Sequence, residues 1–420
     1  MGKITIFDTN VLLSSYEHIF NYYGDTQIYI PIFVLEELDR LKTLSGTAGY
    51  QARQVIRTLE SLLSGYNAAS VVLPGGGTLH IYALTKRTTT LADNNILDFI
   101  LDIQEHNPHS KVTFITNDIN LKLKALALKI ITESFTSPPS IRHEYAGHQQ
   151  RTQMTSEFID TIYKFSQGIA LDLDPVPNVN EYILFKNGKQ SALTKYTADG
   201  LIKRVEAPRE GVCGVNPANL EQVFALDALL DNNIPLVTIT GKAGTGKTLL
   251  ALAAALQKRR DFINIYVARP TVPLSNKDIG YLPGDIKSKL DPFMQPIYDN
   301  LNYIKEVSSV AVDKLLAEEK IVVAPLAYIR GRTLPRKFFL IDEAQNLTIH
   351  EMKTIVTRAG TGTKLVFTGD VDQIDLPNLN QHNNGLSYLI DKFKGDPLFA
   401  HITLKKGERS PLATRAAELL

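Results

Sequence analysis

Short runs of apolar residues alternate with stretches of helical periodicity in the first third of the chain. Three such runs are bounded by polar residues and are too short for helices, as buried strands are: Ile4–Phe7, Ile28–Ile30 and Val112–Ile115. Beside them, apolar residues recur every three or four positions, which predicts four helices: Val34–Leu44, Gly49–Leu63, Asn95–Gln104 and Leu121–Leu128. Strands that alternate with helices indicate a parallel sheet covered on both faces, so we expect a three-layer α/β/α domain over residues 1–135.

The pattern changes after this domain. Ser134–Ser140 is rich in Ser, Thr and Pro and marks a boundary. Two apolar runs, Tyr182–Lys186 and Leu193–Tyr196, flank an Asn-Gly turn and predict a small β element. A chain of 420 residues is long enough for two or three domains. We therefore expect a linker with a small β element over residues 136–210, and a second α/β domain over residues 211–420.

A glycine-rich loop opens the second domain. It lies between the apolar run Ile234–Ile239, read as a buried strand, and Leu249–Leu256, read as a helix. Such a loop directs backbone N–H groups and a helix N-terminus at an anion, which predicts that it binds a nucleoside triphosphate. Its lysine can reach the β/γ-phosphates and its threonine hydroxyl can ligate Mg²⁺. The loop residues are Gly241, Lys242, Ala243, Gly244, Thr245, Gly246, Lys247 and Thr248.

Two later apolar runs also end in polar residues that suit nucleotide hydrolysis. Phe338–Ile341 is followed by Asp342, which can hold the Mg²⁺ water shell, and by Glu343, which can orient or deprotonate the attacking water. The run Lys364–Thr368 precedes Gln373, which is placed to sense the γ-phosphate, although a surface turn has the same pattern. Together with the glycine loop, the acidic pair predicts an ATPase rather than a protein that only binds the nucleotide.

Further polar residues are candidates for adenine and for transition-state charge. Asn216 and Gln222 precede the first strand at the distance expected for adenine recognition; the alternative is that Gln222 faces solvent from a helix. Arginine carries a permanent charge on a bidentate fork, which suits it to stabilise a transferring phosphate. We expect Arg409 to be the catalytic arginine, and Arg330 or Arg332 to face RNA or a neighbouring subunit, although each alone also suits a surface salt bridge.

The second half resembles the PhoH family of ATPases, which are related to the core of superfamily-one helicases. The resemblance rests on an ordered series of motifs: Ala268-Arg269-Pro270, Gly280-Tyr281-Leu282-Pro283-Gly284-Asp285, Arg330-Gly331-Arg332-Thr333, Asp342-Glu343-Ala344-Gln345-Asn346 and Gly369-Asp370-Val371-Asp372-Gln373-Ile374-Asp375. It implies a RecA-like P-loop fold and a homo-oligomeric ring, expected to be a hexamer, with ATP sites between subunits and arginines donated in trans. Only one motor domain is present, which independently favours assembly.

Four acidic residues of the first domain stand where a parallel sheet would gather them. Asp8 and Asp118 follow strands, while Glu37 and Asp93 lie at helix starts. Since the carboxyl ends of parallel strands share one edge, we expect the four carboxylates to converge there. Oxygen ligands without His or Cys favour Mg²⁺ or Mn²⁺, which can activate water for phosphodiester cleavage. Three alternatives stay open: Glu36 in place of Glu37, Asp98 as a further ligand, and a capping role for Asp93.

This half resembles the PIN-domain ribonucleases. Phe7-Asp8-Thr9-Asn10-Val11-Leu12 resembles the opening signature of that family, and the four acids fall at its acidic positions. Thr9, Asn10 and Thr116 fall at its supporting positions. The resemblance implies a metal-dependent endoribonuclease, and the order of the two halves resembles a PIN–PhoH fusion. Many PIN nucleases have a small antitoxin partner, so such a partner is an open expectation here.

Composition adds few constraints. Apolar residues make up 44% and charged residues 21%, and the formal net charge of +1 neither favours nor excludes nucleic acid. Cys213 is the single cysteine, which excludes an intramolecular disulfide and suits a reducing compartment. The chain start lacks the regions of a signal peptide, and no stretch of membrane-spanning length is free of charge. We therefore expect a cytoplasmic protein with no membrane partner.

The leading hypothesis is an ATP-dependent RNA helicase and ribonuclease, in which the motor unwinds single-stranded or overhang RNA and feeds it to the nuclease. The alternatives are an RNA-stimulated ATPase with an inactive PIN domain and a regulatory nucleotide switch. Basic and aromatic positions could bind the RNA strand, although in the middle segment an ordinary exposed hairpin has the same pattern. They are Lys287, Lys289, Arg330, Arg332, Tyr182, Phe185, Lys186, Lys189, Lys195 and Tyr196.

Overall fold

The computed structural model divides the chain into two compact units, Met1–Arg142 and His143–Leu420. The residues that it describes are 2–15, 19–44, 47–63, 70–82, 92–135, 145–152, 154–165, 167–188, 190–270, 286–326, 334–376, 379–381 and 383–407. Within these ranges only the backbone is described at 14–15, 47–48, 92–93 and 286–292. None of the described helices is long and apolar enough to cross a membrane.

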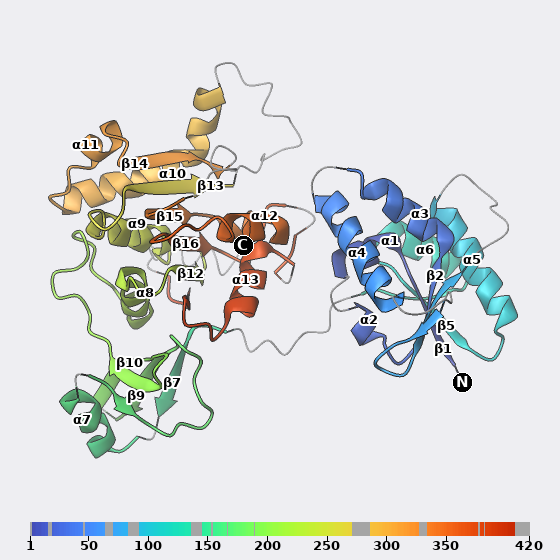
Figure 1. Ribbon diagram of the computed structural model, residues 1–420, viewed down its shortest axis with the longest axis horizontal. Coiled ribbons are helices and arrows are strands. Elements are labelled where there is room, and N and C mark those ends of the chain that lie inside the picture. Colours follow the sequence, from blue (N-terminus) through green and yellow to red (C-terminus); the bar gives the residue numbers. More distant parts are fainter. Residues whose placement is uncertain are drawn as a thin grey trace. The chain divides into compact units, whose positions relative to one another are not determined.

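The first unit is a six-stranded sheet with helices packed on it (Figure 1). The strand order is β3-β4-β2-β1-β5-β6, and every pair is parallel except β3 with β4. The strands are β1 (Lys3–Phe7), β2 (Gln27–Pro31), β3 (Ser70–Val72), β4 (Thr78–Tyr82), β5 (Lys111–Ile115) and β6 (Ile131–Glu133). The helices are α1 (Thr9–Ser15), α2 (Ile19–Tyr22), α3 (Ile32–Leu41), α4 (Thr47–Leu63), α5 (Ala92–His106) and α6 (Ile119–Ala127). The α/β fold expected from the sequence is therefore confirmed.

The register of the central strands positions the polar residues that follow them. Phe7 of β1 lies opposite Ile115 of β5, so Asp8 and Thr116 emerge side by side at the carboxyl edge of the sheet. Asp8 N donates to Ile115 O at 3.0 Å, which fixes this pairing beyond the strand end. Asp118 caps helix α6, because its Oδ1 accepts a hydrogen bond from Leu121 N at 2.9 Å. The apolar core beneath this edge is continuous, as two-sided burial of a parallel sheet requires.

A smaller β module begins the second unit. Its five strands have the order β7-β9-β10-β11-β8, and helix α7 (Ser156–Lys164) packs on it. The strands are β7 (His148–Thr152), β8 (Ile169–Ala170), β9 (Tyr182–Asn187), β10 (Gln190–Tyr196) and β11 (Leu201–Arg204). The hairpin predicted around the Asn-Gly turn is present as the antiparallel pair β9–β10. Ile159 and Ile162 of α7 fill a separate small core under these strands.

Three of the middle-segment side chains expected to bind RNA are buried. Tyr182 and Phe185 are fully buried, and Lys195 is paired with Asp227 and Asp231 of the ATPase region at 2.9 and 2.8 Å. This expectation was wrong for these three residues, because Tyr182 and Phe185 pack into two apolar cores and two carboxylates neutralise Lys195. Lys186 is exposed and Tyr196 is half-buried, so RNA binding by these two stays a prediction. Lys189, Lys287 and Lys289 lie outside the side chains that the structure describes.

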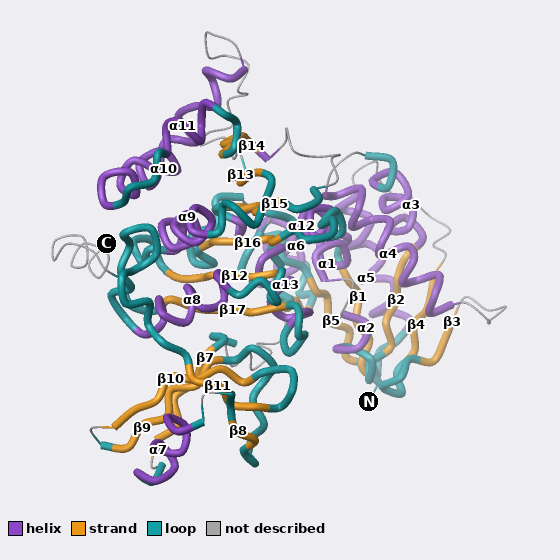
Figure 2. The backbone as a smooth tube through the Cα atoms, turned by 60° about the vertical axis from the view of Figure 1, so that its left-hand side comes forward, coloured by secondary structure: helices purple, strands orange, loops and turns teal. Residues whose placement is uncertain are grey.

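The rest of the second unit is an all-parallel sheet of six strands in the order β14-β13-β15-β16-β12-β17 (Figure 2). The strands are β12 (Leu236–Gly241), β13 (Asn264–Arg269), β14 (Ile321–Pro325), β15 (Lys337–Ile341), β16 (Lys364–Gly369) and β17 (Phe399–Leu404). All six residues of β16 are buried, as expected for a central strand covered on both faces. This order places β16 between the strand of the glycine loop and the strand that ends in the acidic pair.

Helices cover both faces of this sheet (Figures 1 and 2). One apolar core joins the strands to α8 (Leu220–Leu230), α9 (Lys247–Gln257), α10 (Ile286–Val307) and α11 (Val312–Ala317). A second core contains residues of the 3₁₀ turn η3 (Ala344–Asn346), α12 (Ile349–Val356) and α13 (Gly385–Phe393). Helix α9 begins directly at the glycine loop, and its leucine and alanine side chains are buried in the first of these cores. The arrangement confirms the RecA-like P-loop architecture expected for this half.

Candidate functional site: a nucleotide loop and a separate acidic cluster

The glycine loop has the backbone conformation that a phosphate cradle needs. It connects the end of β12 to the start of α9, and Gly246 is the residue before the helix, with a φ of 86°. Gly241 has a φ of 148°, and a Cβ there would lie 2.3 Å from Leu404 O of β17. Both positions therefore favour glycine. The loop presents the N-terminus of an 11-residue helix, which is a favourable site for an anion.

The lysine and threonine of the loop are in place around this cradle. Lys247 Nζ donates to Gly241 O at 2.6 Å and to Lys242 O at 2.9 Å, so its ammonium group lies within the loop. Thr248 Oγ1 donates to Asp342 Oδ1 at 2.8 Å. The structure thus brings together the two residues that the sequence predicts as Mg²⁺ ligands of bound ATP. Their oxygens fit a hard divalent cation, because hydroxyl and carboxylate oxygens are its usual ligands.

Asp342 is a buried carboxylate with several polar neighbours. Its Oδ1 also accepts a hydrogen bond from Thr368 Oγ1 of β16 at 2.7 Å, and the residue is only 5% exposed. Burial raises the pKa of Asp342, and the charge of Glu343 raises it further, while the hydrogen bonds from Thr368 and Thr248 oppose the rise. A bound cation would favour the ionised form by the same Coulombic effect.

Glu343 is held in an unusual backbone conformation. Its φ of 55° lies in the left-handed region that non-glycine residues rarely adopt. Its Oε2 accepts a hydrogen bond from Gln345 Nε2 at 2.6 Å, and the same amide group donates to Gln373 O at 2.8 Å. The backbone of Gln373 is therefore linked to Glu343 through one side chain, whereas the Gln373 side chain is exposed. A γ-phosphate contact of that side chain stays a prediction.

Two residues of this site were not singled out by sequence reasoning. Arg269, at the end of β13, pairs with Glu343 Oε1, and its Nε lies 3.7 Å from Asp342 Oδ2. Asp370, just beyond β16, is 4% exposed and has a buried oxygen, Oδ2, without a hydrogen-bond partner among the described residues. Both belong to motifs quoted for the PhoH resemblance. Their place at the ends of the two strands that flank β15 was the available signal, but strand order cannot be read directly from the chain.

Gln222 contacts the glycine loop rather than solvent. It is 5% exposed; its Nε2 donates to Thr245 O at 3.1 Å and its Oε1 accepts from Ala218 N at 2.7 Å. The solvent-facing alternative is therefore wrong, since the amide joins helix α8 to the loop. Recognition of adenine by Gln222 stays a prediction. The candidate arginines, Arg330, Arg332 and Arg409, lie outside the described residues.

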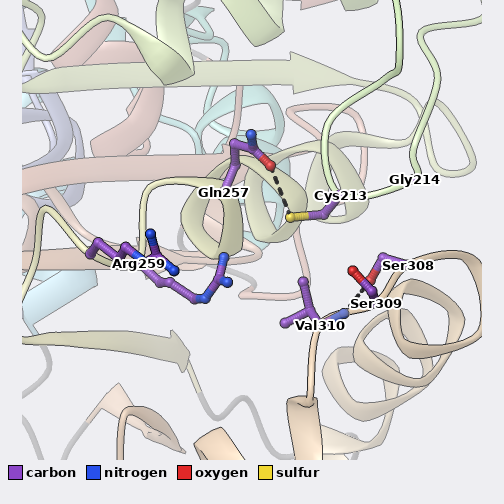
Figure 3. Close-up of a pocket in the computed structure, with 8 residues that line it drawn as sticks. Cys213, Gly214, Gln257, Arg259, Ser308, Ser309 and Val310 are labelled. Carbon is purple, nitrogen blue, oxygen red and sulfur yellow. Dashed lines mark hydrogen bonds between the residues drawn. The ribbon is translucent and has the colours of Figure 1, made fainter.

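A cavity of this unit lies away from the nucleotide loop, and Figure 3 shows the residues that line it. Its volume is about 430 Å³, and its lining includes Cys213, Gln257, Arg259 and Ser308. Gln257 is the last residue of α9, so the cavity is a helix length, ~16 Å at 1.5 Å per residue, from the phosphate end. Arg259 Nη1 donates to Leu256 O at 2.8 Å, which stabilises the carboxyl end of that helix. We therefore do not assign this cavity to ATP.

In the first unit, three of the four predicted acids approach one another. Asp8 is 7% exposed, and its Oδ2 accepts a hydrogen bond from Thr116 Oγ1 at 3.0 Å. Thr9 Oγ1 donates to Glu37 Oε2 at 2.7 Å. Burial raises the pKa of Asp8 to about 6; the hydrogen bond from Thr116 opposes this, and the charges of Glu37 and Asp118 add to it. The cluster thus carries mutual repulsion that a divalent cation would relieve.

The sequence left Glu36 and Glu37 open as alternatives for the acidic site, and the two side chains lie on different sides of helix α3. Glu37 points to the threonine beside Asp8, whereas Glu36 is exposed. The side chain of Asp93 lies outside the described ones, although its backbone begins α5, and Asp98 is exposed. Among the described side chains, no three acidic, His or Cys residues form a ready-made metal site. Asp8 and Glu37, with Asp118, are the donors that would hold a cation here.

Comparison with known proteins agrees with both resemblances. Residues 5–136 match the PIN domain, and residues 214–420 match the PhoH-like protein family. Protein PhoH2 of Bacillus subtilis is 39% identical over 100% of both chains. The proteins named PhoH2 of Mycolicibacterium smegmatis and Thermobispora bispora are 32% and 31% identical over 99% of this chain and 96% of theirs. The chain therefore belongs to the PhoH2 family, with an N-terminal PIN domain followed by a PhoH-like ATPase domain.

Proposed function

We propose that this protein is an ATP-dependent RNA helicase and endoribonuclease. The PhoH-like domain hydrolyses ATP to unwind RNA or draw in its single-stranded end, and the PIN domain cleaves it. The observation that carries the proposal is the presence of two chemically distinct sites in one chain. One joins a phosphate loop to an acidic pair through the bond between Thr248 and Asp342, and the other gathers acids around Asp8.

In the ATPase site, each residue has a separate task. The loop amides and Lys247 bind the phosphates, Thr248 and Asp342 would hold Mg²⁺, and Glu343 accepts a proton from the attacking water. When bound, the cation neutralises charge on the phosphate oxygens. Glu343 suits the role of base because its carboxylate lies at the carboxyl edge of the sheet, next to Asp342.

In the PIN site, Asp8, Glu37 and Asp118 would hold Mg²⁺ or Mn²⁺, with Asp93 as a fourth donor. The cation, when bound, supplies an activated water for phosphodiester cleavage. Thr116 and Thr9 orient two of the carboxylates by the hydrogen bonds at 3.0 and 2.7 Å. Such oriented donors lower the cost of assembling the site around the cation.

We further propose a homo-oligomeric ring, a hexamer, that works on RNA with a single-stranded overhang in the cytoplasm. One motor domain in each chain supports this, because translocation along a strand needs at least two. Mass photometry with and without ATP would measure the number of subunits. A protein that stays monomeric with ATP and RNA would contradict the ring. Co-purification from the native host would test for a small antitoxin-like partner.

The decisive experiment uses a labelled RNA with a 5′ overhang and a duplex, incubated with Mg²⁺ or Mn²⁺, with and without ATP. We expect wild-type protein to cleave the duplex only with ATP. The Asp8→Asn variant should lose cleavage and keep ATP turnover, and the Lys247→Ala variant should lose ATP turnover and duplex cleavage. RNA-stimulated ATP turnover without cleavage under either metal would instead establish an ATPase with an inactive PIN domain.

A further inference from the structure

Arg269 stands at the meeting point of three groups in the ATPase site. It is the last residue of β13, the strand next to β15, so its side chain emerges beside the acidic pair. Its Nη2 donates to Glu343 Oε1, its Nε lies 3.7 Å from Asp342 Oδ2, and its Nη1 donates to Phe293 O of α10 at 3.2 Å. With 20% of its side chain exposed, Arg269 is largely buried among these partners.

The carboxylate of Glu343 is bound from two sides. Arg269 takes one oxygen and Gln345 takes the other, and each oxygen has a second lone pair that remains able to accept a hydrogen bond from water. Both bonds act on a residue with a φ of 55°, a conformation that is unfavourable for a residue with a Cβ. The two side-chain bonds therefore help to hold a backbone conformation that would otherwise relax.

We propose that Arg269 is a positioning residue for ATP hydrolysis, which orients the Glu343 carboxylate toward the attacking water. This inference rests on the proposed ATPase activity and adds the residue that prepares its base. The role requires an arginine, because three N–H groups of one rigid fork reach two carboxylates and a helix carbonyl at once. A lysine in its place retains the charge and loses this geometry.

The same contacts connect the base to the rest of the domain. The bond to Phe293 O ties Arg269 to α10, and Gln345 ties Glu343 to the backbone of Gln373 beyond β16. The orientation of the carboxylate is thus set by elements on either side of β15. The hydrogen bonds and ion pairs described for Arg269 reach Phe293, Glu343 and Asp342 and not the glycine loop, so we expect nucleotide affinity to depend on it only weakly.

The test is a kinetic double-mutant cycle on the full-length protein. Arg269→Gln should lower kcat for ATP roughly 100-fold, the size of effect that a misplaced catalytic group produces, and change KM less than about twofold. In a Glu343→Gln background, the same substitution should cause no further loss, because the group that it orients is already absent. Radiolabelled ATP under single-turnover conditions gives the residual rates of these variants.

Two further variants make the result interpretable. Arg259→Gln removes another partly exposed arginine bonded to a backbone carbonyl, and should leave kcat unchanged. Arg269→Lys should lower kcat as much as Arg269→Gln does. If the Arg269→Gln protein does not fold, Arg269→Lys takes its place in the double-mutant cycle. The melting temperature of each variant, with and without ATP, shows that the nucleotide still binds.

Several results would overturn the inference. A raised KM with normal kcat would mean that Arg269 contacts the nucleotide, and independent losses in the double variant would mean that it does not act through Glu343. Unchanged kcat in Arg269→Gln, alongside inactive Lys247→Ala, would refute the inference and leave the proposed ATPase intact. A wild-type protein without ATP turnover would refute both.

Discussion

His401 makes the ATPase unit sensitive to mild acid. It lies on β17, is 2% exposed, and is bonded on both ring nitrogens, with Thr238 Oγ1 2.8 Å from Nδ1 and Thr403 Oγ1 3.0 Å from Nε2. Burial lowers the pKa of His401 from 6.5 to about 3; the bond to Thr238 opposes this, and the neighbouring His148 adds to it. Between about pH 3 and pH 6.5 the ring is therefore neutral in the folded protein, whereas an unfolded histidine is charged.

The sign and size of the effect follow from linkage. Between pH 6.5 and 3, the unfolded chain binds a proton at this position that the folded chain does not. The stabilisation is thus complete above about pH 6.5 and is lost as the pH falls below it. For these two pKa values, the loss relative to neutral pH is about 1.4 kcal/mol at pH 5.5 and about 2.7 kcal/mol at pH 4.5.

Replacing His401 by glutamine isolates this contribution, since an amide can donate to one threonine and accept from the other without titrating. The matched control is His109→Gln, which removes an exposed histidine of the first unit. Scanning calorimetry at pH 7.5 and 5.5 compares the two variants, and all other titrating groups cancel in the difference. We expect the melting temperature to fall about 4 °C less on acidification in His401→Gln than in the control.

Equal falls in the two variants would refute the reasoning, because they would show that the buried ring does not resist protonation. A larger fall in His401→Gln would refute it as well. We expect the two variants to melt at the same temperature at pH 7.5. On acidification, the melting temperature of His401→Gln should fall less than that of the control.

Three further predictions concern single contacts. Gly246→Ala should weaken binding of a fluorescent ATP analogue about tenfold, since a Cβ at a φ of 86° costs roughly 1–2 kcal/mol; unchanged affinity would contradict the cradle. Thr248→Val should lose Mg²⁺-dependent ATP turnover while Thr248→Ser retains it, which a phosphate-release assay measures; equal rates would rule out a ligand role for the hydroxyl. Lys195→Met should destabilise the second unit by about 3 kcal/mol in chemical denaturation, because two partly buried carboxylates lose their cation; a change under about 0.5 kcal/mol would mean that the pair is not stabilising.

The elements that carry strong local signals could be predicted from the chain. The glycine loop, the strand before Asp342 and the strands before Asp8 and Thr116 are short apolar runs followed by special residues, and all are present. The approach of Asp8, Glu37 and Asp118 followed as well, since parallel strands end at one edge, whereas the side chain of Asp93 lies outside those described. The choice of Glu37 over Glu36 did not follow, because one residue turns the side chain by 100° around the helix, and the apolar pattern alone did not fix that phase.

Other parts of the site depend on strand order, which periodicity does not encode. Arg269 reaches Glu343 only because β13 lies next to β15, although 74 residues separate the two positions. For Lys195, by contrast, the sequence predicted an RNA contact that the structure does not support. A lysine next to a tyrosine in a hairpin strand is usually exposed, and only the carboxylates of Asp227 and Asp231, at the end of α8, explain its burial.

The attachment of the β module to β17 has a practical consequence for producing the ATPase alone. Thr403 N donates to Ala146 O at 2.8 Å, and Asn180 Nδ2 donates to Pro397 O and Phe399 O at 2.9 Å, so the module covers the last strand of the sheet. A truncation at residue 211, where sequence patterns place the domain start, would leave β17 paired only with β12, uncover its outer edge and remove the partner of Asp227. An unpaired edge strand invites aggregation. A fragment that starts near residue 143 keeps the edge covered and should be the soluble one.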